Sequence, residues 1–426
     1  MKIKKIELQK FRVFSLAEID LDGKSTVFFG INGTGKSSLL RAVSLLYANI
    51  INQTVNRKDL KQQYNIMLDD IRYGMSMTKI QATFDIFDND TKLVEYHRIM
   101  TRQDGKRAHN KENLNEIVEN IQKSYFSDEL QENIPLFVNY GTNRLILDIP
   151  LRIKTHHEFD IYSAYEKAIE SKINFRVFFE WYRNQEDTEN AEKVTTGNLQ
   201  YEDKFMRSVR KAILAMLPEF KNLHIARKPR LAMVVEKNGF SLNVSQLSDG
   251  EKCVMAMLGD LARRLAIANP LLDNPLEGSG VVLIDEIELH MHPSWQRKIL
   301  SVLRETFPNI QFIITTHSPQ VLGELDKNYK IFALTSENNE TFVQEIEQMN
   351  GFDSNYILEE FMGTKSINQD FQKILDEANA AISDNKFDRA KEEIEKVKKI
   401  AGLNSVAVIE LEGNLKRRQW LYDKNH

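Results

Sequence analysis

The sequence predicts an α/β fold built around a mixed sheet, and three apolar segments support this prediction. The first, at residues 25–29, leads into a glycine-rich loop and then into a segment with helical spacing. The other two, at residues 280–284 and 311–316, each end in polar residues. Continuous apolar runs of this length are typical of strands that are buried on both faces of a parallel sheet.

The glycine-rich loop at residues 30–37 reads GINGTGKS, which is the spacing of a phosphate-binding loop. Its glycines let backbone N–H groups turn toward phosphate oxygens. Lys36 can reach the β- and γ-phosphates, Ser37 can ligate Mg²⁺, and the following helix directs its positive end toward the anion. A glycine-rich turn with a chance lysine is the alternative, but the order of strand, loop and helix favours a site for ATP and Mg²⁺. The residues that we expect to bind the nucleotide here are Asn32, Gly33, Gly35, Lys36, Ser37 and Ser38.

The second and third apolar runs end in residues that are suited to phosphate chemistry. Asp285 and Glu286 follow the second run, and His317 follows the third. Ligands of open α/β sheets bind at the carboxyl ends of the strands, so we expect these side chains near the phosphates. Asp285 would then hold the Mg²⁺ and Glu286 would orient and deprotonate the attacking water. Each acid alone would more often be a strand-end residue or a helix cap, but the three runs together favour the catalytic interpretation.

A second motif, LSDGEK at residues 247–252, precedes a segment with helical spacing that runs to about Ala268. Ser248 and Glu251 have the spacing of a capping box, so Ser248 could simply cap that helix. A helix N-terminus with a hydroxyl and a close-approach glycine, here Gly250, is also an anion site. Capping and nucleotide binding are compatible, and the motif predicts both.

Length and composition restrict the class of protein. At 426 residues the chain can hold two or three domains with a sizeable core. The net charge of −4 argues against a uniformly basic surface for nucleic acid but allows a local basic groove. The single cysteine, Cys253, excludes an internal disulfide and fits a cytoplasmic protein. No apolar run approaches the length of a bilayer span, so we expect no membrane contact.

The remaining elements are predicted from apolar periodicity and turn residues. At the start of the chain we expect a strand pair at 2–21, a hairpin at 79–87 and 93–100, a helix at 110–132 and a strand at 136–140. In the middle we expect helices at 157–172, 175–185 and 202–217, a charged loop at 187–196, and a hairpin at 231–236 and 240–244. Near the end we expect a strand at 329–335 that completes the sheet edge, and helices at 370–381, 387–401 and 406–422.

Several segments together resemble the RecF/SMC/OLD-like branch of ABC-type ATPases. They are the first strand with Phe11 and Arg12, the phosphate loop, the motif at 247–252, which is similar to the ABC signature, and the acid pair with the segment that follows it to residue 293. Further segments resemble the PtuA family, the ATPase subunits of Septu anti-phage systems, and the related retron-associated ATPases; they lie at 139–144, 178–190, 351–358 and 387–391. The resemblance covers nearly the whole chain.

The resemblance implies an ABC-type ATPase head that works as a homodimer or a higher homo-oligomer. In such families ATP lies between the phosphate loop of one head and the signature of another, which would contribute Ser248, Gly250 and Glu251. The catalytic residues would be Lys36, Glu286 and His317, and the Mg²⁺ ligands would be Ser37 and Asp285. The resemblance also implies slow ATP hydrolysis, an HNH nuclease partner of the PtuB type, and nucleic acid bound through the complex.

In terms of regions, we expect the head at residues 1–145 and 246–345. A mainly helical insertion lobe with a hairpin would occupy residues 146–245, and a helical region for oligomerisation or partner docking would occupy residues 346–426. The family glutamine that connects the two lobes has no counterpart at residues 140–144. Asn143 or Arg144 could do related work, and a structural turn is an equal alternative.

Two other functions remain open. One is a RecF-like ATPase that binds or repairs DNA without a nuclease partner, and the other is a non-hydrolysing scaffold that senses nucleotide. The acid pair argues against the second. His290 and His292 could suggest a metal pair, but the resemblance favours a dimer-contact segment there. The pair His156-His157 has no third ligand nearby, so we expect solvated side chains.

Overall fold

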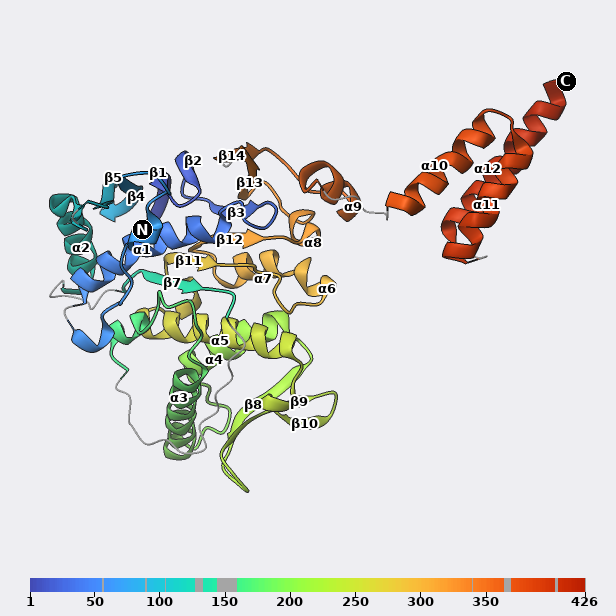
Figure 1. The fold of residues 1–426 in the computed structure, drawn as a ribbon. Helices are drawn as coiled ribbons and strands as arrows, with labels where there is room; N and C mark the ends of the chain where they lie inside the picture. The colour runs from blue at the N-terminus through green and yellow to red at the C-terminus, as the bar shows by residue number, and fades with distance from the viewer. Residues whose placement is uncertain are drawn as a thin grey trace. The chain divides into compact units, whose positions relative to one another are not determined.

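The structure is a computed structural model of the chain, and it describes residues 1–55, 57–88, 90–103, 105–126, 133–143, 159–338, 340–363, 369–402 and 405–425. The chain forms two compact units, Met1–Phe352 and Asp353–His426 (Figure 1). No helix in the described ranges combines the length with the apolar character that crossing a bilayer requires.

The centre of the first unit is a six-stranded mixed sheet, which confirms the predicted α/β fold. Its strands, in spatial order, are β14 (Glu340–Ile346), β13 (Tyr329–Glu337), β3 (Ser25–Phe29), β12 (Ile310–Thr316), β11 (Gly280–Ile284) and β7 (Leu136–Tyr140). Neighbouring strands from β13 to β7 pair in parallel, whereas β14 runs antiparallel to β13. Every residue of β11 and β12 is buried, because this sheet is covered on both faces.

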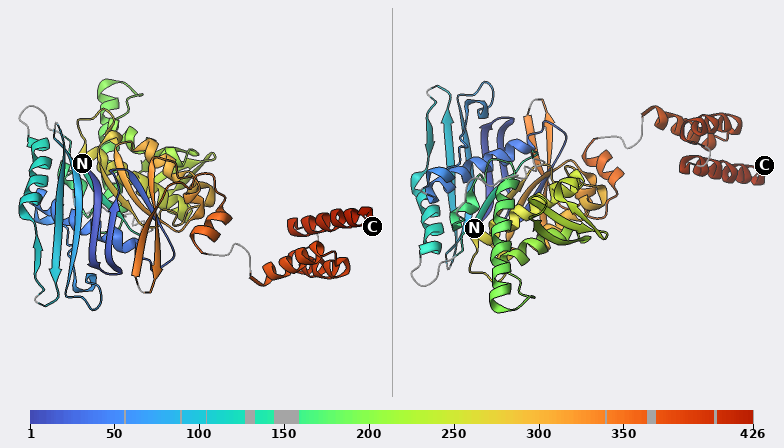
Figure 2. Two further views of the ribbon diagram at one scale, coloured as in Figure 1. Left: turned by 90° about the horizontal axis from the view of Figure 1, so that it is seen from above. Right: turned by 90° about the horizontal axis from the view of Figure 1, so that it is seen from below.

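Helix α1 (Lys36–Thr54) lies between this sheet and a second, antiparallel sheet (Figure 2). The strands of the second sheet, in spatial order, are β2 (Phe14–Asp20), β1 (Lys2–Phe11), β4 (Met77–Asp88), β5 (Asp90–Thr101) and β6 (Arg107–His109). The ring of Tyr47 on α1 stacks on Phe137 of β7 at a centroid distance of 4.3 Å and meets the edge of Phe84 of β4 at 5.7 Å. The helix that follows the phosphate loop is therefore fixed by both sheets.

The opposite face of the mixed sheet is covered by α5 (Asp249–Ala268), against which α3 (Phe175–Thr196) and α4 (Lys204–Met216) pack (Figure 1). A small antiparallel sheet follows, with the strands β8 (Phe220–Ala226), β9 (Ala232–Lys237) and β10 (Phe240–Asn243). The other helices of this unit are α2 (Lys111–Phe126), α6 (Pro293–Gln296), α7 (Ile299–Thr306) and α8 (Pro319–Leu322). The predicted N-terminal strand pair, both hairpins and helix α5 agree with the structure.

A buried charge cluster joins α5 to β7. Asp260 has no exposed surface, and it accepts hydrogen bonds from Arg263 at 2.8 Å and from Arg264 at 2.7 Å. Its second oxygen also accepts from the hydroxyl of Tyr140 at 3.0 Å. Burial alone would raise the pKa of Asp260, but the two guanidinium groups outweigh it and lower this pKa to about 2. The carboxylate thus stays charged in the interior.

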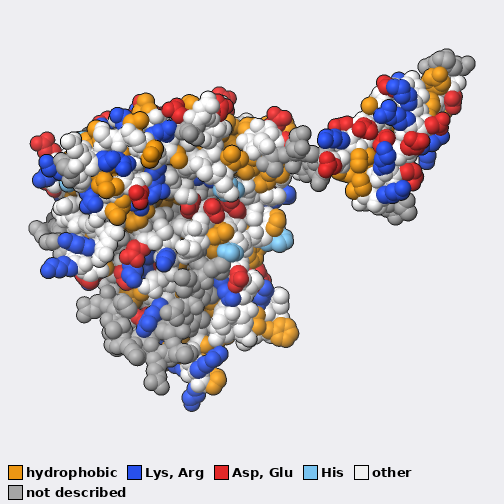
Figure 3. Space-filling model, in the orientation of Figure 1, with side chains coloured by type: hydrophobic (Ala, Val, Ile, Leu, Met, Phe, Trp, Pro, Cys, Tyr) orange, Lys and Arg blue, Asp and Glu red, His pale blue; other side chains and the backbone are white. Residues whose placement is uncertain are grey.

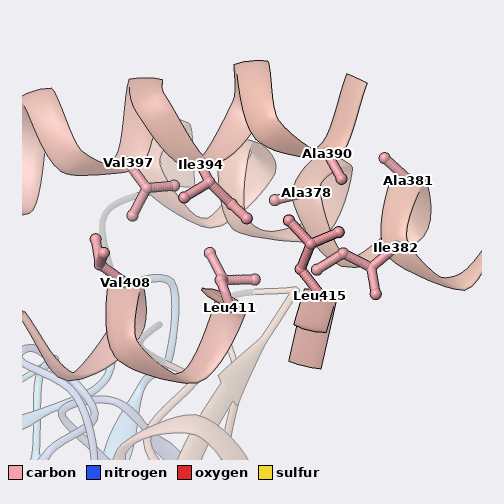
Figure 4. Packing of buried hydrophobic residues seen from close by; sticks show 9 residues of the cluster. All are labelled: Ala378, Ala381, Ile382, Ala390, Ile394, Val397, Val408, Leu411 and Leu415. Atoms are coloured by element: carbon pink, nitrogen blue, oxygen red, sulfur yellow. The ribbon is translucent and has the colours of Figure 1, made fainter. Parts of the chain in front are cut away.

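The second unit begins with α9 (Ser354–Tyr356) and contains three longer helices, α10 (Gln369–Ser383), α11 (Phe387–Ala401) and α12 (Val406–Asn425). Their apolar faces meet in one core, shown in Figure 4. The core consists of Ala378, Ala381, Ile382, Ala390, Ile394, Val397, Val408, Leu411 and Leu415. These helices confirm the prediction of a helical C-terminal region.

The predicted charged loop at residues 187–196 is wrong, because α3 continues to Thr196. Glu189, in the middle of that stretch, is 1% exposed. It accepts hydrogen bonds from Arg210 of α4 at 2.9 Å and from Lys193 at 2.7 Å. A paired carboxylate can be buried where an unpaired one could not, so these charges belong to a helix that faces α4.

The predicted helix at residues 157–172 is also wrong. Residues 157 and 158 lie outside the described ranges, and the rest contains only a short 3₁₀ helix at Ile161–Tyr165. After it the chain runs beside β7: the backbone N–H of Asn139 donates to Ala168 O at 2.8 Å, and that of Gly141 donates to Ser171 O at 3.0 Å. The edge of β7 therefore takes the hydrogen bonds that a helix would have used.

One other prediction needs correction. The strand at 329–335 does not complete the sheet edge, because β14 pairs with β13 on its outer side. Most side chains of β14 are exposed or half-buried, which fits such an edge strand. The helix predicted at 110–132 corresponds to α2, and residues 127–132 lie outside the described ranges. The division of the first unit into a head and an insertion lobe stays a prediction.

We predict that Asp260→Ala lowers the free energy of unfolding by about 3–5 kcal/mol, because two guanidinium groups would remain buried without a counter-charge. Urea denaturation of the full chain measures this. The matched control is Asp187→Ala on α3, where the ion pairs with Arg183 and Arg227 are about half exposed and removal should cost about 1 kcal/mol or less. Equal losses in the two variants would contradict the role given to the buried cluster.

Candidate nucleotide-binding site

The predicted site residues come together at one edge of the mixed sheet. Strands β3, β12 and β11 are parallel neighbours, so the segments that follow them emerge at the same edge. These segments are the phosphate loop, His317 and the pair Asp285-Glu286. Figure 3 shows acidic side chains and histidines gathered over this part of the first unit.

The phosphate loop has the backbone that its glycines predict. Gly35 is the N-cap of α1 and has φ of 98°, in the left-handed region that favours glycine. A Cβ there would lie 2.5 Å from Val13 Cγ2, so space also requires glycine. Helix α1 begins at Lys36, and the free N–H groups of its first turn, which holds Ser37 and Ser38, are available to an anion.

Lys36 is folded into the loop. Its ammonium donates hydrogen bonds to Gly30 O and Ile31 O, both at 2.9 Å, and the residue is 5% exposed. Burial lowers the pKa of Lys36 to about 8, although Asp285 and Glu286 oppose this effect. A phosphate would add negative charge next to the ammonium and stabilise its protonated form.

The acid pair is held by the neighbouring strand. Thr315 on β12 donates its hydroxyl proton to Asp285 Oδ1 at 2.5 Å, and the same hydroxyl accepts from the backbone N–H of Glu286 at 2.8 Å. On the other side, the backbone N–H of Asp285 donates to Tyr140 O at 2.8 Å. Glu286 has φ of 49°, an uncommon value for a residue with a side chain, which sets the direction of its carboxylate.

Ser37 and Asp285 line one cavity of about 260 Å³. Hydroxyl and carboxylate oxygens suit Mg²⁺, which keeps several waters and takes its remaining ligands from substrate phosphates. Two protein groups therefore suffice. This fits the finding that the described residues contain no cluster of three His, Cys, Asp or Glu side chains for a metal ion.

Asn139 is a residue of this cavity whose contribution sequence reasoning missed. It is 6% exposed, and its Nδ2 donates to Ser171 Oγ at 2.8 Å. Its Oδ1 has no hydrogen-bond partner among the described residues. Thr142 and Asn143 line the same cavity, whereas Arg144 lies outside the described ranges. A polar residue inside the otherwise apolar run of β7 was the available signal.

His317 faces the acid pair. Its Nε2 lies 3.9 Å from Glu286 Oε1, and burial together with the nearby Lys36 lowers its pKa, so the imidazole is neutral at pH 7. Its backbone N–H donates to Glu288 Oε1 at 2.6 Å, and the Thr316 hydroxyl donates to Glu288 Oε2 at 2.8 Å. Glu288 was predicted only as part of a dimer-contact segment, yet it fixes the position of His317.

The signature motif forms the predicted capping box. The Ser248 hydroxyl and backbone N–H donate to Glu251 Oε2 at 2.7 and 2.9 Å, and the Lys237 ammonium pairs with the other oxygen of Glu251. Glu251 is 4% exposed, so its carboxylate serves its own chain, whereas Ser248 is exposed. A Cβ on Gly250 would lie 2.5 Å from His290 O, so the glycine lets the signature pack on the segment after the acid pair.

The structure describes two of the four histidines that were considered as metal ligands, His290 and His292. His292 caps α6, where its Nδ1 lies 2.8 Å from Ser294 Oγ and accepts from the Ser294 backbone N–H at 3.3 Å. His290 is exposed with φ of 62°. The pair His156-His157 lies outside the described ranges.

We predict that Glu288→Ala destabilises the first unit by about 1–3 kcal/mol, because the half-buried backbone N–H of His317 loses its acceptor. Glu288→Gln keeps one acceptor oxygen and should lose less. Urea denaturation provides the free energies, and hydrogen exchange at His317 provides the local readout. The control is Glu305→Ala, which changes an exposed residue of α7. If Glu288→Ala lowers the free energy of unfolding by no more than Glu305→Ala does, Glu288 does not hold the segment at His317.

Comparison with known proteins shows a family match and similarity to proteins named as probable ATPases. The family model described as "AAA domain, putative AbiEii toxin, Type IV TA system" matches residues 25–323, which include the phosphate loop, the acid pair and His317. The chain is 30% identical to the Retron Ec83 probable ATPase of Escherichia coli over 388 residues, covering 76% of this chain and 70% of that protein. It is 29% identical to the Retron Vc95 probable ATPase of Vibrio cholerae serotype O1 biovar El Tor, covering 79% and 76%.

A more distant relative matches almost the whole chain. The Septu protein PtuA of Bacillus mycoides (strain KBAB4) is 24% identical over 437 residues, which is 99% of this chain. The match covers 52% of that protein, so the chain spans about half the length of this relative.

Proposed function

Because the chain belongs to the AAA domain family whose model it matches and is a PtuA-like ATPase, we propose that it drives an anti-phage defence complex by binding and slowly hydrolysing ATP between two heads. The observation that carries this proposal is the meeting of Lys36, Asp285, Glu286 and His317 at one sheet edge. Ser248, an exposed residue at the start of α5, supports a signature that acts on the nucleotide of a second copy.

Each residue then has a role in the proposed reaction. The first turn of α1 and the Lys36 ammonium bind the phosphates, while Ser37 and Asp285 hold the Mg²⁺, which supplies charge neutralisation when bound. Glu286 orients and deprotonates the attacking water, and neutral His317 donates to the γ-phosphate.

Asn139 has a related role in the proposal. Asn139 lines the cavity of Ser37 and Asp285, and its buried Oδ1, which has no hydrogen-bond partner among the described residues, would accept a hydrogen bond from a water after a small rotation of the side chain. In this chain it would do the work of the missing lobe-connecting glutamine, in place of Asn143 or Arg144.

The partners belong to the proposal as well. We place the chain in the cytoplasm, as a homodimer or higher homo-oligomer whose helical region at 346–426 or insertion lobe at 146–245 docks an HNH nuclease. Nucleic acid would be bound through that complex. A RecF-like DNA-binding ATPase is the second candidate, and ATP-dependent retention of DNA by the chain without a partner would favour it.

Lys36→Ala should weaken ATP binding at least tenfold, because it removes a charge-assisted contact of about 1.5–3 kcal/mol to the phosphates. Isothermal titration calorimetry measures the affinity. Lys24→Ala, an exposed lysine before β3, is the control. An unchanged affinity of Lys36→Ala would show that this loop does not bind the phosphates.

Glu286→Gln should bind ATP and nearly abolish its hydrolysis, because the amide keeps the shape of the side chain but cannot take a proton. We also expect the closed dimer to accumulate in the presence of ATP and Mg²⁺. Phosphate release and analytical ultracentrifugation measure the two effects. Hydrolysis at the rate of the unmodified chain would remove Glu286 from the catalytic role.

The chain alone should cut neither DNA nor RNA in Mg²⁺ or Mn²⁺, because the described residues contain no metal-binding cluster outside the ATP site. With the HNH partner, cleavage should depend on the nucleotide state. Deletion of residues 366–426 should break assembly or partner docking and leave Lys36-dependent ATP binding intact. Cleavage by the chain alone, lost on mutation of a carboxylate outside the ATP site, would contradict the proposal.

A further inference from the structure

Helix α12 has one face in the core of the second unit and another that its own unit leaves uncovered. Val408, Leu411 and Leu415 face the core (Figure 4). On the opposite side Ile409 and Trp420 are each 60% exposed. Their helical spacing places them on one stripe of α12. Large apolar side chains in such a stripe mark a surface that a protein partner covers.

Gly413 lies in the middle of this stripe. A Cβ built on it would meet no atom within 4 Å, so packing inside the unit does not require glycine here. Glycine in a helix interior lowers helix stability relative to alanine. An exposed glycine between Ile409 and Trp420 is explained if another helix approaches α12 closely at this point.

The architecture of the second unit also indicates a missing neighbour. Helices α10 and α11 form a helix–turn–helix pair, and Val408 and Leu415 of α12 follow Ile374 and Ala381 of α10 by about 34 residues, the period of tetratricopeptide-like repeats. Helix α12 thus stands where the first helix of a second pair would stand. Repeats of this kind bury their faces against neighbours, whereas Ile409 and Trp420 on this face of α12 are exposed among the described residues.

The charged residues on the uncovered face of α12 indicate which kind of helix would pack against it. Glu410 lies in the first half of α12, and Lys416 and Arg417 lie in the second half; all three are exposed. Among the described residues none of the three has an ion-pair partner within 4 Å, and Lys416 interacts only at longer range with Glu412, which pairs with Lys398. A helix that is acidic at one end and basic at the other is complementary to a second copy of itself in the antiparallel direction, whereas the parallel direction would bring like charges together.

We propose that α12 of a second copy of this chain covers the face, with the two helices antiparallel and related by a two-fold axis at Gly413. In this register Glu410 of each chain lies opposite Lys416 and Arg417 of the other. Trp420 of one chain reaches Ile409 of the other, within one helical turn. The absence of a Cβ at Gly413 lets the two backbones come close on the axis.

This inference deepens the proposed homo-oligomer, since it assigns a contact that does not need ATP. Two 20-residue helices bury less surface than a standard protein interface, so the contact alone is weak. Joined to a second contact between heads, it would act at a high effective concentration. The two contacts together would give assemblies larger than a dimer.

The first test is site-specific cross-linking of the full chain without nucleotide. The native Cys253 is buried, so an added surface cysteine can be addressed selectively. We expect Gly413→Cys to form covalent dimers with a short bismaleimide linker, whereas Lys424→Cys, also on the exposed side of α12, should not, because its two copies lie at opposite ends of the pair. Equal cross-linking of both variants, or none with Gly413→Cys, would overturn the proposal.

The second test exchanges the charges on α12, and it distinguishes binding of a second copy of this chain from binding of a different protein. Lys416→Glu with Arg417→Glu should reduce nucleotide-free self-association at least fivefold in sedimentation, because acids then face Glu410. Adding Glu410→Arg to this variant restores complementarity only if the partner is the same chain, so self-association should return. Failure of the triple variant to regain it, or an unchanged double variant, would refute self-pairing and leave a different protein as the occupant.

These outcomes are independent of the ATP site. The proposed function fails if Lys36→Ala binds ATP normally, whatever the result at Gly413. The α12 contact fails if the charge exchange has no effect, whatever the result at Lys36. Thermal unfolding of each variant shows that loss of association does not reflect loss of fold.

Discussion

Parallel pairing of β3, β12 and β11 is the constraint on which the rest of the site depends. Phe29 pairs with Thr316, and Ile314 pairs with Ile284, so the three strands end within a residue or two of one another. Each strand end carries a different chemistry: an anion-binding loop, a histidine, and two carboxylates. These groups lie far apart in the sequence, and no local interaction could bring them together. A slip of one residue in either pairing would turn the side chains to the other face.

Polar contacts then fix the direction of each group. Thr315 binds Asp285 and the backbone of Glu286, and Glu288 returns from the same segment to bind the backbone of His317. The carbonyl of Tyr140 accepts from Asp285, while its hydroxyl donates to Asp260 on the signature helix. One residue of β7 thus joins the acid pair to α5. Thr315, Tyr140 and Asp260 are buried, so we expect a change at one of them to disturb the polar contacts of the groups that it holds.

The sequence was sufficient for the parts of the fold that have a local signal. The phosphate loop, the apolar strands and the capping box of Ser248 each have a short-range physical cause, and each lies where it was predicted. The errors arose where distant contacts decide the structure. The charges after residue 187 belong to a helix because Glu189 is buried against Arg210 of α4, and β14 is the edge strand because β13 is already paired with β3. The roles of Asn139 and Glu288 were missed for the same reason. Asn139 bonds to Ser171 and Glu288 bonds to His317, and both partners are about 30 residues away in the chain.

The central claim is that ATP is bound between the phosphate loop of one chain and the signature of another. Mixing two inactive variants tests it most directly: Lys36→Ala has a defective loop, and Ser248→Arg has a blocked signature. An equal mixture forms dimers that contain one intact composite site, so ATPase activity should return to about a quarter of that of the unmodified chain under random pairing. A mixture that stays as inactive as its components would contradict the account, because it would mean that loop and signature act within one chain or that the signature has no part in the site.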